Sequence, residues 1–277
     1  MTYAAFQQAF FSQLKSVGIP LEEVRALWAR WTEWKHGNRL SYSLVPPDQA
    51  LPDAKDALAV LARLSAHEPW AHIRGEVEFA GLNLQIDARA LIPRPETEEV
   101  LAAALEVLPV GGRLLDWCTG SGCIALGAKA ARPEAHVEGW EWSEEALTLA
   151  RHNAEHTKLH VDFFQADLNS LPTASSDPWD VLVSNPPYIH PSEHLDASVA
   201  DFEPHAALYS PAEDVLHFYR RLKSWAEVQL RPQGYLVLEC HAVHCRATAA
   251  LFDEGWGEPE ILLDFCGKER TVRVQRV

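Results

Sequence analysis

Four residues at the end of an apolar stretch, Asn185-Pro186-Pro187-Tyr188, could bind and orient a planar amine. Proline fixes its own φ angle and keeps the preceding residue extended, so the segment is stiff. Neither proline has an N–H, so the exposed carbonyls of the segment only accept hydrogen bonds, and the side-chain oxygen of Asn185 is a further acceptor. Two acceptors match an NH₂ group and leave its lone pair free to attack an electrophile. Tyr188 can pack against the planar group and confine it.

A loop of small residues between a predicted strand and a predicted helix is the second candidate site. Small residues allow the backbone to approach a ligand at a helix N-terminus. The loop does not match the G-x-G-x-x-G dinucleotide pattern, because Cys118 and Ala125 stand at the first and last glycine positions. Its pattern, D-x-x-T-G-S-G from Asp116, suits a nucleoside that carries an amino acid tail. The predicted cofactor-binding residues of this loop are Cys118, Thr119, Gly120, Ser121 and Gly122.

Two carboxylates end the next two predicted strands. Glu141, roughly 20 residues after the loop, can accept hydrogen bonds from both hydroxyls of a ribose. Asp167 can accept from an adenine amino group, and we assign Leu168 to the same site. The alternatives are a solvated carboxylate at the strand end for Glu141 and a turn residue for Asp167. Ser143 is the expected N-cap of the following helix.

Two further groups of residues have several interpretations. Cys240, His241, His244 and Cys245 are metal-type ligands, but adjacent residues at a strand end point to opposite faces, so convergence on one zinc ion is not expected. We interpret them as the edge of a pocket and the start of a helix. In the segment that precedes the helix from Pro95, Arg94 and Glu98 are candidates for the mouth of the cofactor site, or simply for a helix start.

The elements that must position these residues follow from hydrophobic periodicity. Residues 1–72 predict three helices, the third over 48–67, and their tryptophans are expected to pack in a core. Residues 73–95 predict a connector that contains a β-hairpin. Residues 96–277 alternate strands and helices, which predicts a parallel sheet covered on both faces, with antiparallel strands added at the end. The expected strands are 113–118, 136–142, 160–167, 180–188, 234–240, 260–265 and 271–276, with a helix over 212–230 before the fifth.

Composition limits the class of protein. The 277 residues are 47% apolar, which is ample for a packed core, and no apolar run is long enough to span a bilayer. The start has no basic region ahead of an apolar one, and the five cysteines include no C-x-x-C pair, so we expect a cytoplasmic protein with reduced thiols. With 24 basic and 39 acidic residues the net charge is −15, which disfavours nucleic acid as the main substrate but leaves a local basic patch open.

Four segments in order along the chain carry a resemblance to a known family: IPRPETE, DWCTGSG, VSNPPYI and FEPHAAL, which begin at Ile92, Asp116, Val183 and Phe202. The chain resembles S-adenosylmethionine-dependent methyltransferases of planar NH₂ nitrogens. More narrowly, it resembles the HemK family of protein-(glutamine-N5) methyltransferases, over almost its whole length. NPPY alone is shared with adenine N6 methyltransferases, whereas PRPETE with FEPHAAL is more specific. The resemblance implies a seven-stranded Rossmann-like class I methyltransferase domain of mostly parallel sheet, with a small all-helical N-terminal substrate-recognition domain.

The resemblance also implies a substrate and residue roles. One branch of the family methylates the glutamine of the Gly-Gly-Gln motif in class I peptide chain release factors, so we expect such a factor as partner and S-adenosyl-L-methionine as cofactor. The alternatives are a ribosomal protein glutamine, adenine N6 of RNA or DNA, and a cofactor-binding module without turnover. Residues 185–187 would receive the amide and Tyr188 would lie beside it; the loop 189–210 would frame the channel. The family usually has glycine at Cys118 and often aspartate at Glu141, so we expect altered cofactor affinity.

Overall fold

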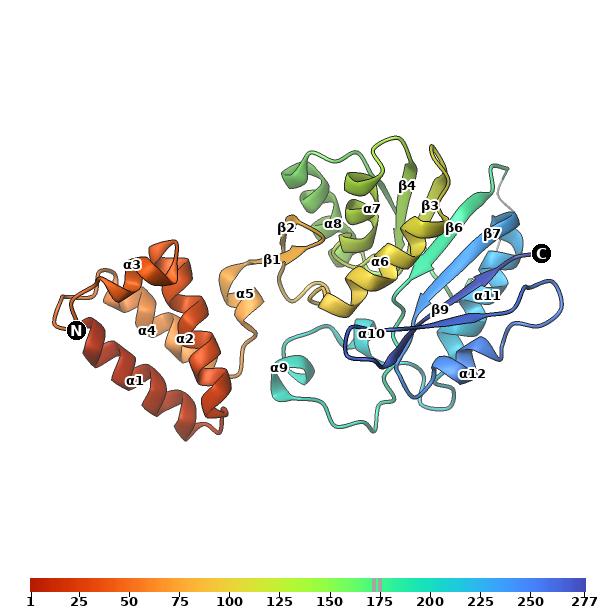
Figure 1. The fold of residues 1–277 in the computed structure, drawn as a ribbon. Helices are drawn as coiled ribbons and strands as arrows, with labels where there is room; N and C mark the ends of the chain where they lie inside the picture. Colours follow the sequence, from red (N-terminus) through yellow and green to blue (C-terminus); the bar gives the residue numbers. More distant parts are fainter. Residues whose placement is uncertain (171–172, 174–175) are drawn as a thin grey trace. The chain divides into compact units, whose positions relative to one another are not determined.

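The computed structural model describes residues 1–170, 173 and 176–277, which divide into two compact units. The first unit comprises residues 1–74 together with 197–202, and the second comprises 75–196 and 203–277. Figure 1 colours both along the sequence. The predicted hairpin, β1 (Glu76–Phe79) and β2 (Leu82–Gln85), belongs to the second unit and is antiparallel as expected.

The first unit is helical, as predicted, and its core is aromatic. Thr2 caps the first helix by accepting a hydrogen bond from the Ala5 N–H at 3.2 Å. Trp28 and Trp31 are buried and their rings stack 5.1 Å apart, which confirms the expected core packing, whereas Trp34 is 38% exposed. The helices are α1 (Tyr3–Ser16), α2 (Leu21–His36), α3 (Arg39–Ser43), α4 (Ala54–Ser65), α5 (Trp70–Arg74) and α9 (Ala197–Ala200).

The prediction of three N-terminal helices was incomplete. A short extra helix, α3, follows α2 because Asn38 caps it, accepting from the Ser41 N–H at 2.8 Å. The third predicted helix begins six residues later than expected, at Ala54 instead of Asp48. The reason is Pro52, which disfavours helical backbone in the residue before it. α5 is also additional.

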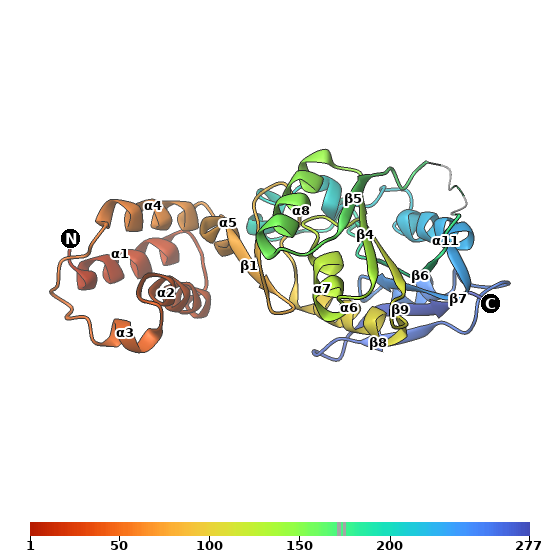
Figure 2. The same cartoon turned by 90° about the horizontal axis from the view of Figure 1, so that it is seen from above.

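The second unit contains one seven-stranded sheet in the order β5-β4-β3-β6-β7-β9-β8. The first five strands in this order are parallel, β9 pairs antiparallel with β7, and β8 pairs antiparallel with β9, which confirms the predicted fold class. The order can be followed in Figures 1 and 2. The strands are β3 (Arg113–Trp117), β4 (His136–Glu141), β5 (Asp162–Gln165), β6 (Trp179–Ser184), β7 (Leu230–Glu239), β8 (Glu260–Leu263) and β9 (Glu269–Gln275).

Alternation along the strands creates a core on each face of the sheet. On β6, Val181 and Val183 join the core under the hairpin, α6 (Pro95–Val107), α7 (Cys123–Ala131) and α8 (Glu144–Thr157). Leu182 joins the opposite core, under α11 (His217–Gln229) and α12 (Cys245–Ala249). Strand ends are therefore the places where side chains reach a site instead of a core. The short α10 (His205–Leu208) lies within the loop that follows β6.

Several predicted boundaries in this unit were wrong. β5 spans Asp162–Gln165 instead of 160–167, and β6 ends at Ser184 instead of 188. α11 begins at His217, five residues later than predicted, because the Asp214 side chain accepts from the Leu216 N–H at 3.0 Å and forms a turn there. β7 begins at Leu230 instead of 234, and an irregularity in its pairing with β6 lies between Trp179 and Val181.

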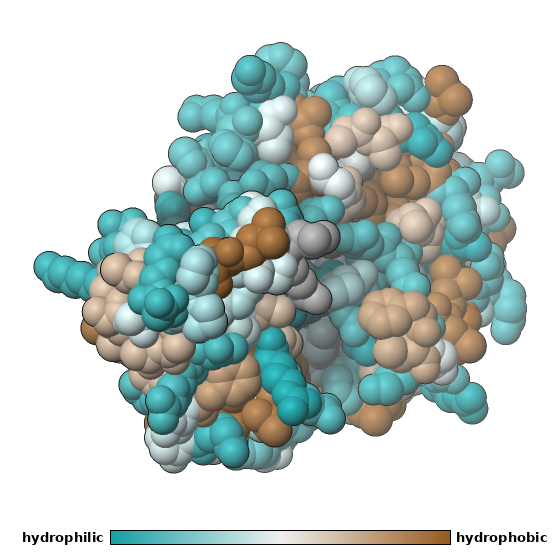
Figure 3. Space-filling view, turned by 60° about the vertical axis from the view of Figure 1, so that its left-hand side comes forward, coloured by the Kyte–Doolittle hydropathy of each residue, from teal (hydrophilic) through white to brown (hydrophobic). Residues whose placement is uncertain are grey.

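Figure 3 shows one face on which hydrophilic residues surround separate smaller groups of hydrophobic ones. Exposed large apolar side chains include Trp142 and Phe265, at 59% and 63% exposed. Within residues 1–170, 173 and 176–277, no helix combines the length and apolar character needed to cross a membrane.

Candidate functional site

A cavity of about 690 Å³ lies at the carboxyl ends of β3, β4 and β6. The chain runs outwards from β3 to β4 and β5 and then returns to β6 on the other side of β3, and ligands of open α/β sheets bind at such a reversal. Trp117 pairs with Ser184, so the loop after β3 and the NPPY segment after β6 start side by side. Of the predicted residues, the cavity is lined by Cys118, Thr119, Gly120, Ser121, Glu141, Asp167, Leu168, Asn185 and Pro187, and not by Gly122, Pro186 or Tyr188.

The loop after β3 owes its shape to left-handed backbone. Gly120 and Gly122 have φ angles of 55° and 83°, where glycine has no steric penalty. A Cβ on Gly122 would also come within 3.1 Å of Phe163, so its role is packing beneath the loop. Cys118, which stands where a glycine was expected, has a φ of 60° and carries the strain of that conformation.

Asp116, at the penultimate position of β3, holds this loop from below. Its Oδ2 accepts from the Thr119 hydroxyl at 2.5 Å and from the Ala125 N–H at 3.1 Å. Burial raises the pKa of Asp116 to about 7, although these two hydrogen bonds oppose the shift. Burial also raises the pKa of the Cys118 thiol well above its usual range, so this cysteine stays protonated and is no nucleophile.

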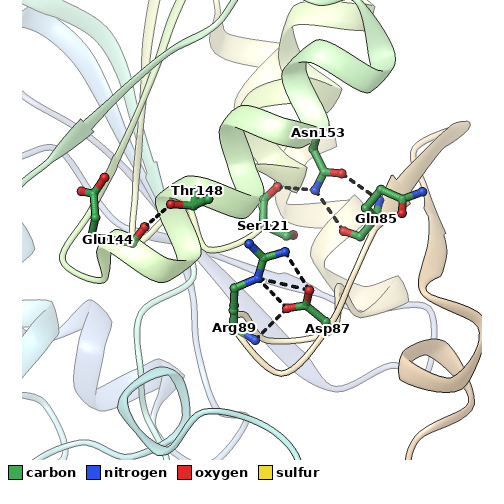
Figure 4. Close-up of polar contacts among 7 residues, drawn as sticks. All are labelled: Gln85, Asp87, Arg89, Ser121, Glu144, Thr148 and Asn153. Carbon is green, nitrogen blue, oxygen red and sulfur yellow. Dashed lines mark hydrogen bonds and ion pairs between the residues drawn. The ribbon is translucent and has the colours of Figure 1, made fainter.

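Two residues that sequence reasoning missed support the same loop. Gly139 on β4 leaves room for it: a Cβ there would lie 2.8 Å from the Thr119 Oγ1 and 2.6 Å from Phe163. Asn153 on α8 is fully buried and donates from Nδ2 to the carbonyls of Ser121 at 2.9 Å and Gln85 at 3.0 Å, while its Oδ1 accepts from the Gln85 N–H at 2.7 Å (Figure 4). No local pattern signals either role, because the partners are distant in sequence.

Glu141 is fixed in place by three backbone N–H groups. Its Oε2 accepts from Gly120 at 3.0 Å, and its Oε1 accepts from Trp142 at 2.9 Å and Ser143 at 3.0 Å. Burial raises the pKa of Glu141, and the three hydrogen bonds act against that rise. Oε1 already accepts two hydrogen bonds, whereas Oε2 accepts one and keeps a lone pair, so the carboxylate can still accept from a bound hydroxyl group. Ser143 caps α8 as predicted, accepting from the Ala146 N–H at 3.3 Å.

Asp167 is a turn residue, as one interpretation expected, and its contact with an adenine amino group stays a prediction. Its Oδ1 accepts from the Asn169 N–H at 2.8 Å, which is a turn, and the residue also lines the cavity. Leu168 is buried, lines the cavity beside it, and is held by its carbonyl, which accepts from the Trp225 Nε1 at 3.1 Å.

The NPPY segment continues β6 and starts beside the loop that follows β3. Asn185 and Pro187 line the cavity; Pro186 is buried outside the lining. The Asn185 Nδ2 lies 3.4 Å from the Thr97 Oγ1 on α6, and the Tyr188 hydroxyl lies 3.5 Å from the Glu239 Oε1 at the end of β7. The cavity is thus lined by the loop and the carboxylate that follow β3 and β4, which form the proposed cofactor end, and by Asn185 and Pro187 of the stiff NPPY segment, which form the proposed acceptor end.

Comparison with known proteins agrees with this geometry. The chain is 40% identical over 271 residues to a release factor glutamine methyltransferase of Deinococcus radiodurans, covering 96% of this chain and 95% of that protein. A protein of the same name from Bacteroides thetaiotaomicron is 37% identical over 220 residues, covering 78% and 79%. The chain belongs to the release factor glutamine methyltransferase family. The resemblance predicted from the four sequence segments is therefore confirmed.

Two further comparisons concern a domain within the chain and the fold. The model of the Methyltransferase small domain matches residues 96–208, which contain the loop after β3, Glu141 and the NPPY segment. A methyltransferase from Pyrococcus furiosus has a similar fold, with a TM-score of 0.51 and 18% identity, covering 81% of this chain and 98% of that one.

In this member of the methyltransferase family, the FEPHAAL segment closes one side of the cavity. Glu203 is buried, accepts from the Ile92 N–H at 2.9 Å and forms an ion pair with Arg94. Residues 204–207, Arg94 and Tyr209 line the cavity, so the predicted role of the loop end in framing it has a structural basis. Glu98 does not line the cavity; it accepts from the Ala80 N–H at 3.0 Å in the hairpin turn.

The Cys/His group is not part of the cavity lining, so its predicted place at the pocket edge was wrong. Cys240 and Cys245 are buried thiols that pack in the core under α12, which Cys245 begins, as predicted. The rings of His241 and His244 lie 5.6 Å apart. No three His, Cys, Asp or Glu side chains in the described part of the chain are arranged to hold a metal ion.

Proposed function

We propose that this protein methylates the side-chain amide nitrogen, N5, of the glutamine in the Gly-Gly-Gln motif of class I translation release factors, with S-adenosyl-L-methionine as donor. The observation that carries the proposal is the position of Asn185 and Pro187 on the same cavity as Glu141 and the 118–121 loop. The names of the relatives support the choice of a release factor as substrate.

The residues at the loop end of the cavity fit a nucleoside with an amino acid tail. A volume of about 690 Å³ lies within the range of small-molecule sites. Thr119, Gly120 and Ser121 would hold the amino acid end, Glu141 the ribose, and Asp167 with Leu168 the adenine. No atom lies within 4 Å of the place where a Cβ of Gly120 would stand, so a ligand can approach the backbone there. The bound cofactor supplies a methyl group already activated on a sulfonium centre.

The residues at the other end would bind the glutamine amide. The Asn185 side-chain oxygen would accept one N–H proton and the Pro186 carbonyl the other, although Pro186 itself does not line the cavity, and the prolines fix the spacing of these acceptors. The amide lone pair is thereby turned out of conjugation and aimed along the cavity. Exclusion of water by the lining of residues 204–207 strengthens the hydrogen bonds. Tyr188 lies beside this rim and would confine the planar group.

The test is direct transfer of labelled methyl groups. Purified protein is incubated with S-adenosylmethionine labelled on the methyl carbon, a class I release factor, ribosomal proteins and structured RNA, and products are located by mass spectrometry. The expected product is a release factor peptide heavier by one methyl group on the Gly-Gly-Gln glutamine. A matched factor with that glutamine changed to asparagine should stay unmodified. Label in RNA or in a ribosomal protein instead, or label nowhere, would contradict the proposal.

A further inference from the structure

Two buried polar residues behind the NPPY segment have no role in the chemistry described so far. Thr97, in the first turn of α6, and Glu239, the last residue of β7, are 2% and 1% exposed. The Thr97 hydroxyl lies 2.7 Å from the Glu239 Oε2, and its oxygen lies 3.4 Å from the Asn185 Nδ2. Burying a carboxylate costs free energy unless hydrogen bonds replace its lost contacts with water. The burial and the hydrogen bonds of Glu239 therefore indicate a function.

The direction of these hydrogen bonds is fixed by the chemistry of their groups. An ionised carboxylate only accepts, so the single proton of the Thr97 hydroxyl goes to Glu239. The Thr97 oxygen can then only accept, and the group of Asn185 that faces it must be the NH₂. The Asn185 oxygen is left as the free acceptor. The contact of 3.4 Å is long, as is common in enzymes without substrate, where such bonds tighten on binding.

The same carboxylate also reaches the other end of the segment. Its second oxygen, Oε1, lies 3.5 Å from the Tyr188 hydroxyl, and the Tyr219 hydroxyl donates to the Glu239 backbone carbonyl at 3.1 Å. Glu239 is thus held through its main chain by Tyr219. Its Oε2 is linked to Asn185 through Thr97, and its Oε1 lies close to the hydroxyl of Tyr188. Two prolines make the segment stiff but do not choose which way the Asn185 amide faces.

The geometry points to Thr97 and Glu239 as positioning residues that turn the side-chain oxygen of Asn185 towards the incoming amide. The inference rests on the proposed function, in which that oxygen accepts a proton of the substrate NH₂. Thr97 is also among the residues that line the cavity, whereas Glu239 is not, and neither is proposed to contact the reacting amide. If Glu239 were protonated, it could donate to Thr97, whose own proton would then be free for Asn185, and the amide could face the wrong way.

This arrangement links turnover to the ionisation of Glu239. Burial raises its pKa to about 7, and the Thr97 hydrogen bond opposes the rise. The ionised form selects the working orientation, so kcat is expected to fall as pH falls from about 8 to about 6. The ionisable or charged groups that act on Glu239 or lie against it from neighbouring elements are Glu96, Arg270, Tyr188, Tyr219 and Cys123.

The first test replaces the Thr97 hydroxyl. Thr97→Val keeps the side-chain shape and should lower kcat roughly 10- to 100-fold, with KM for the release factor and cofactor affinity within about 2-fold. Thr97→Ser, which keeps the hydroxyl, should recover kcat to within about 3-fold of the wild type. The matched control is Thr157→Val on α8, whose hydroxyl bonds only helix carbonyls in the described structure. A Thr97→Val enzyme with full kcat would overturn the inference.

The second test uses pH and has two readouts, kcat and the NMR signals of Asn185, of which the second does not depend on methylation. In Glu239→Gln the fall of kcat between pH about 8 and about 6 should disappear, because the amide does not ionise in that range. Side-chain ¹⁵NH₂ signals of Asn185, identified by their loss in Asn185→Ala, should titrate with Glu239 in the wild type and not in Glu239→Gln or Thr97→Val. Unchanged titration in both variants would contradict the inference. If the wild type methylates no release factor, the proposed function fails, and the ¹⁵NH₂ titration still decides the orientation of Asn185.

Discussion

The two ends of the cavity are built by different means. At the cofactor end, backbone N–H groups of residues 120, 142 and 143 converge on Glu141, and left-handed residues shape the loop. At the acceptor end, two prolines and a series of side chains from Asn185 to Thr97 and Glu239 set the geometry. A site made of backbone depends on the fold around it, whereas a site made of side chains depends on single functional groups. Substitutions at the first end should therefore change affinity or stability, and those at the second end turnover.

The largest effect is expected from Asn185→Ala. Removal of an acceptor that acts in the transition state should lower kcat by about 10³-fold, while the dissociation constant of the cofactor changes by less than about 3-fold. Single-turnover methylation and calorimetric titration with S-adenosylmethionine measure the two quantities. Asn83→Ala, on the hairpin and bonded to Glu76, is the control. An equal loss of cofactor affinity in the Asn185 variant would remove the distinction between the two ends.

Glu141→Ala should have the opposite profile. The change removes the proposed ribose acceptor and the partner of the Gly120 N–H, so cofactor affinity should fall roughly 30- to 100-fold. At saturating cofactor, kcat should stay within about 3-fold of the wild type. Calorimetric titration tests this, with the exposed Glu144→Ala as control. A loss in kcat with unchanged cofactor affinity would contradict the assignment of Glu141 to the cofactor end.

Gly139→Ala tests the close packing beneath the loop. The added Cβ would lie 2.6 Å from Phe163 and 2.8 Å from the Thr119 Oγ1, which should lower the free energy of unfolding by roughly 1–3 kcal/mol. Gly257→Ala is the matched control, since its Cβ would meet nothing closer than 3.6 Å. Urea unfolding of both variants measures the difference. Equal stability of the two would show that the loop is free to move away from β4.

The smallest effect is expected at Cys118. Because its φ is 60°, Cys118→Gly should relieve strain and raise the free energy of unfolding by up to about 1 kcal/mol, with cofactor affinity within about 3-fold. Cys123→Gly, at the first residue of α7, should instead lower stability by about 1 kcal/mol. Urea unfolding and calorimetric titration report both. Abolished cofactor binding in Cys118→Gly would mean that the side chain, and not the backbone, serves the site.

Much of this architecture could be predicted from the sequence because its signals are local. The strands, the Ser143 cap and Pro95 in the first turn of α6 follow from periodicity and from the preferences of single residues. The supporting residues could not be predicted this way, since Thr97 meets Glu239 across 142 positions and Asn153 meets Gln85 across 68. Thr97 belongs to the IPRPETE segment, but no pattern in the sequence assigned it a role. Likewise, the late start of α11 depends on one side-chain hydrogen bond of Asp214.

The buried Asn153 links the hairpin to the loop that we propose to bind the cofactor. One carboxamide ties the backbone of β2 to the Ser121 carbonyl (Figure 4), so the strand edge and the loop can separate only by breaking the same set of bonds. When a ligand settles the loop, the Gln85 N–H should exchange its hydrogen with solvent more slowly, although Gln85 itself contacts no ligand. The exchange rate of this one backbone amide in the hairpin would then indicate whether the cofactor is bound.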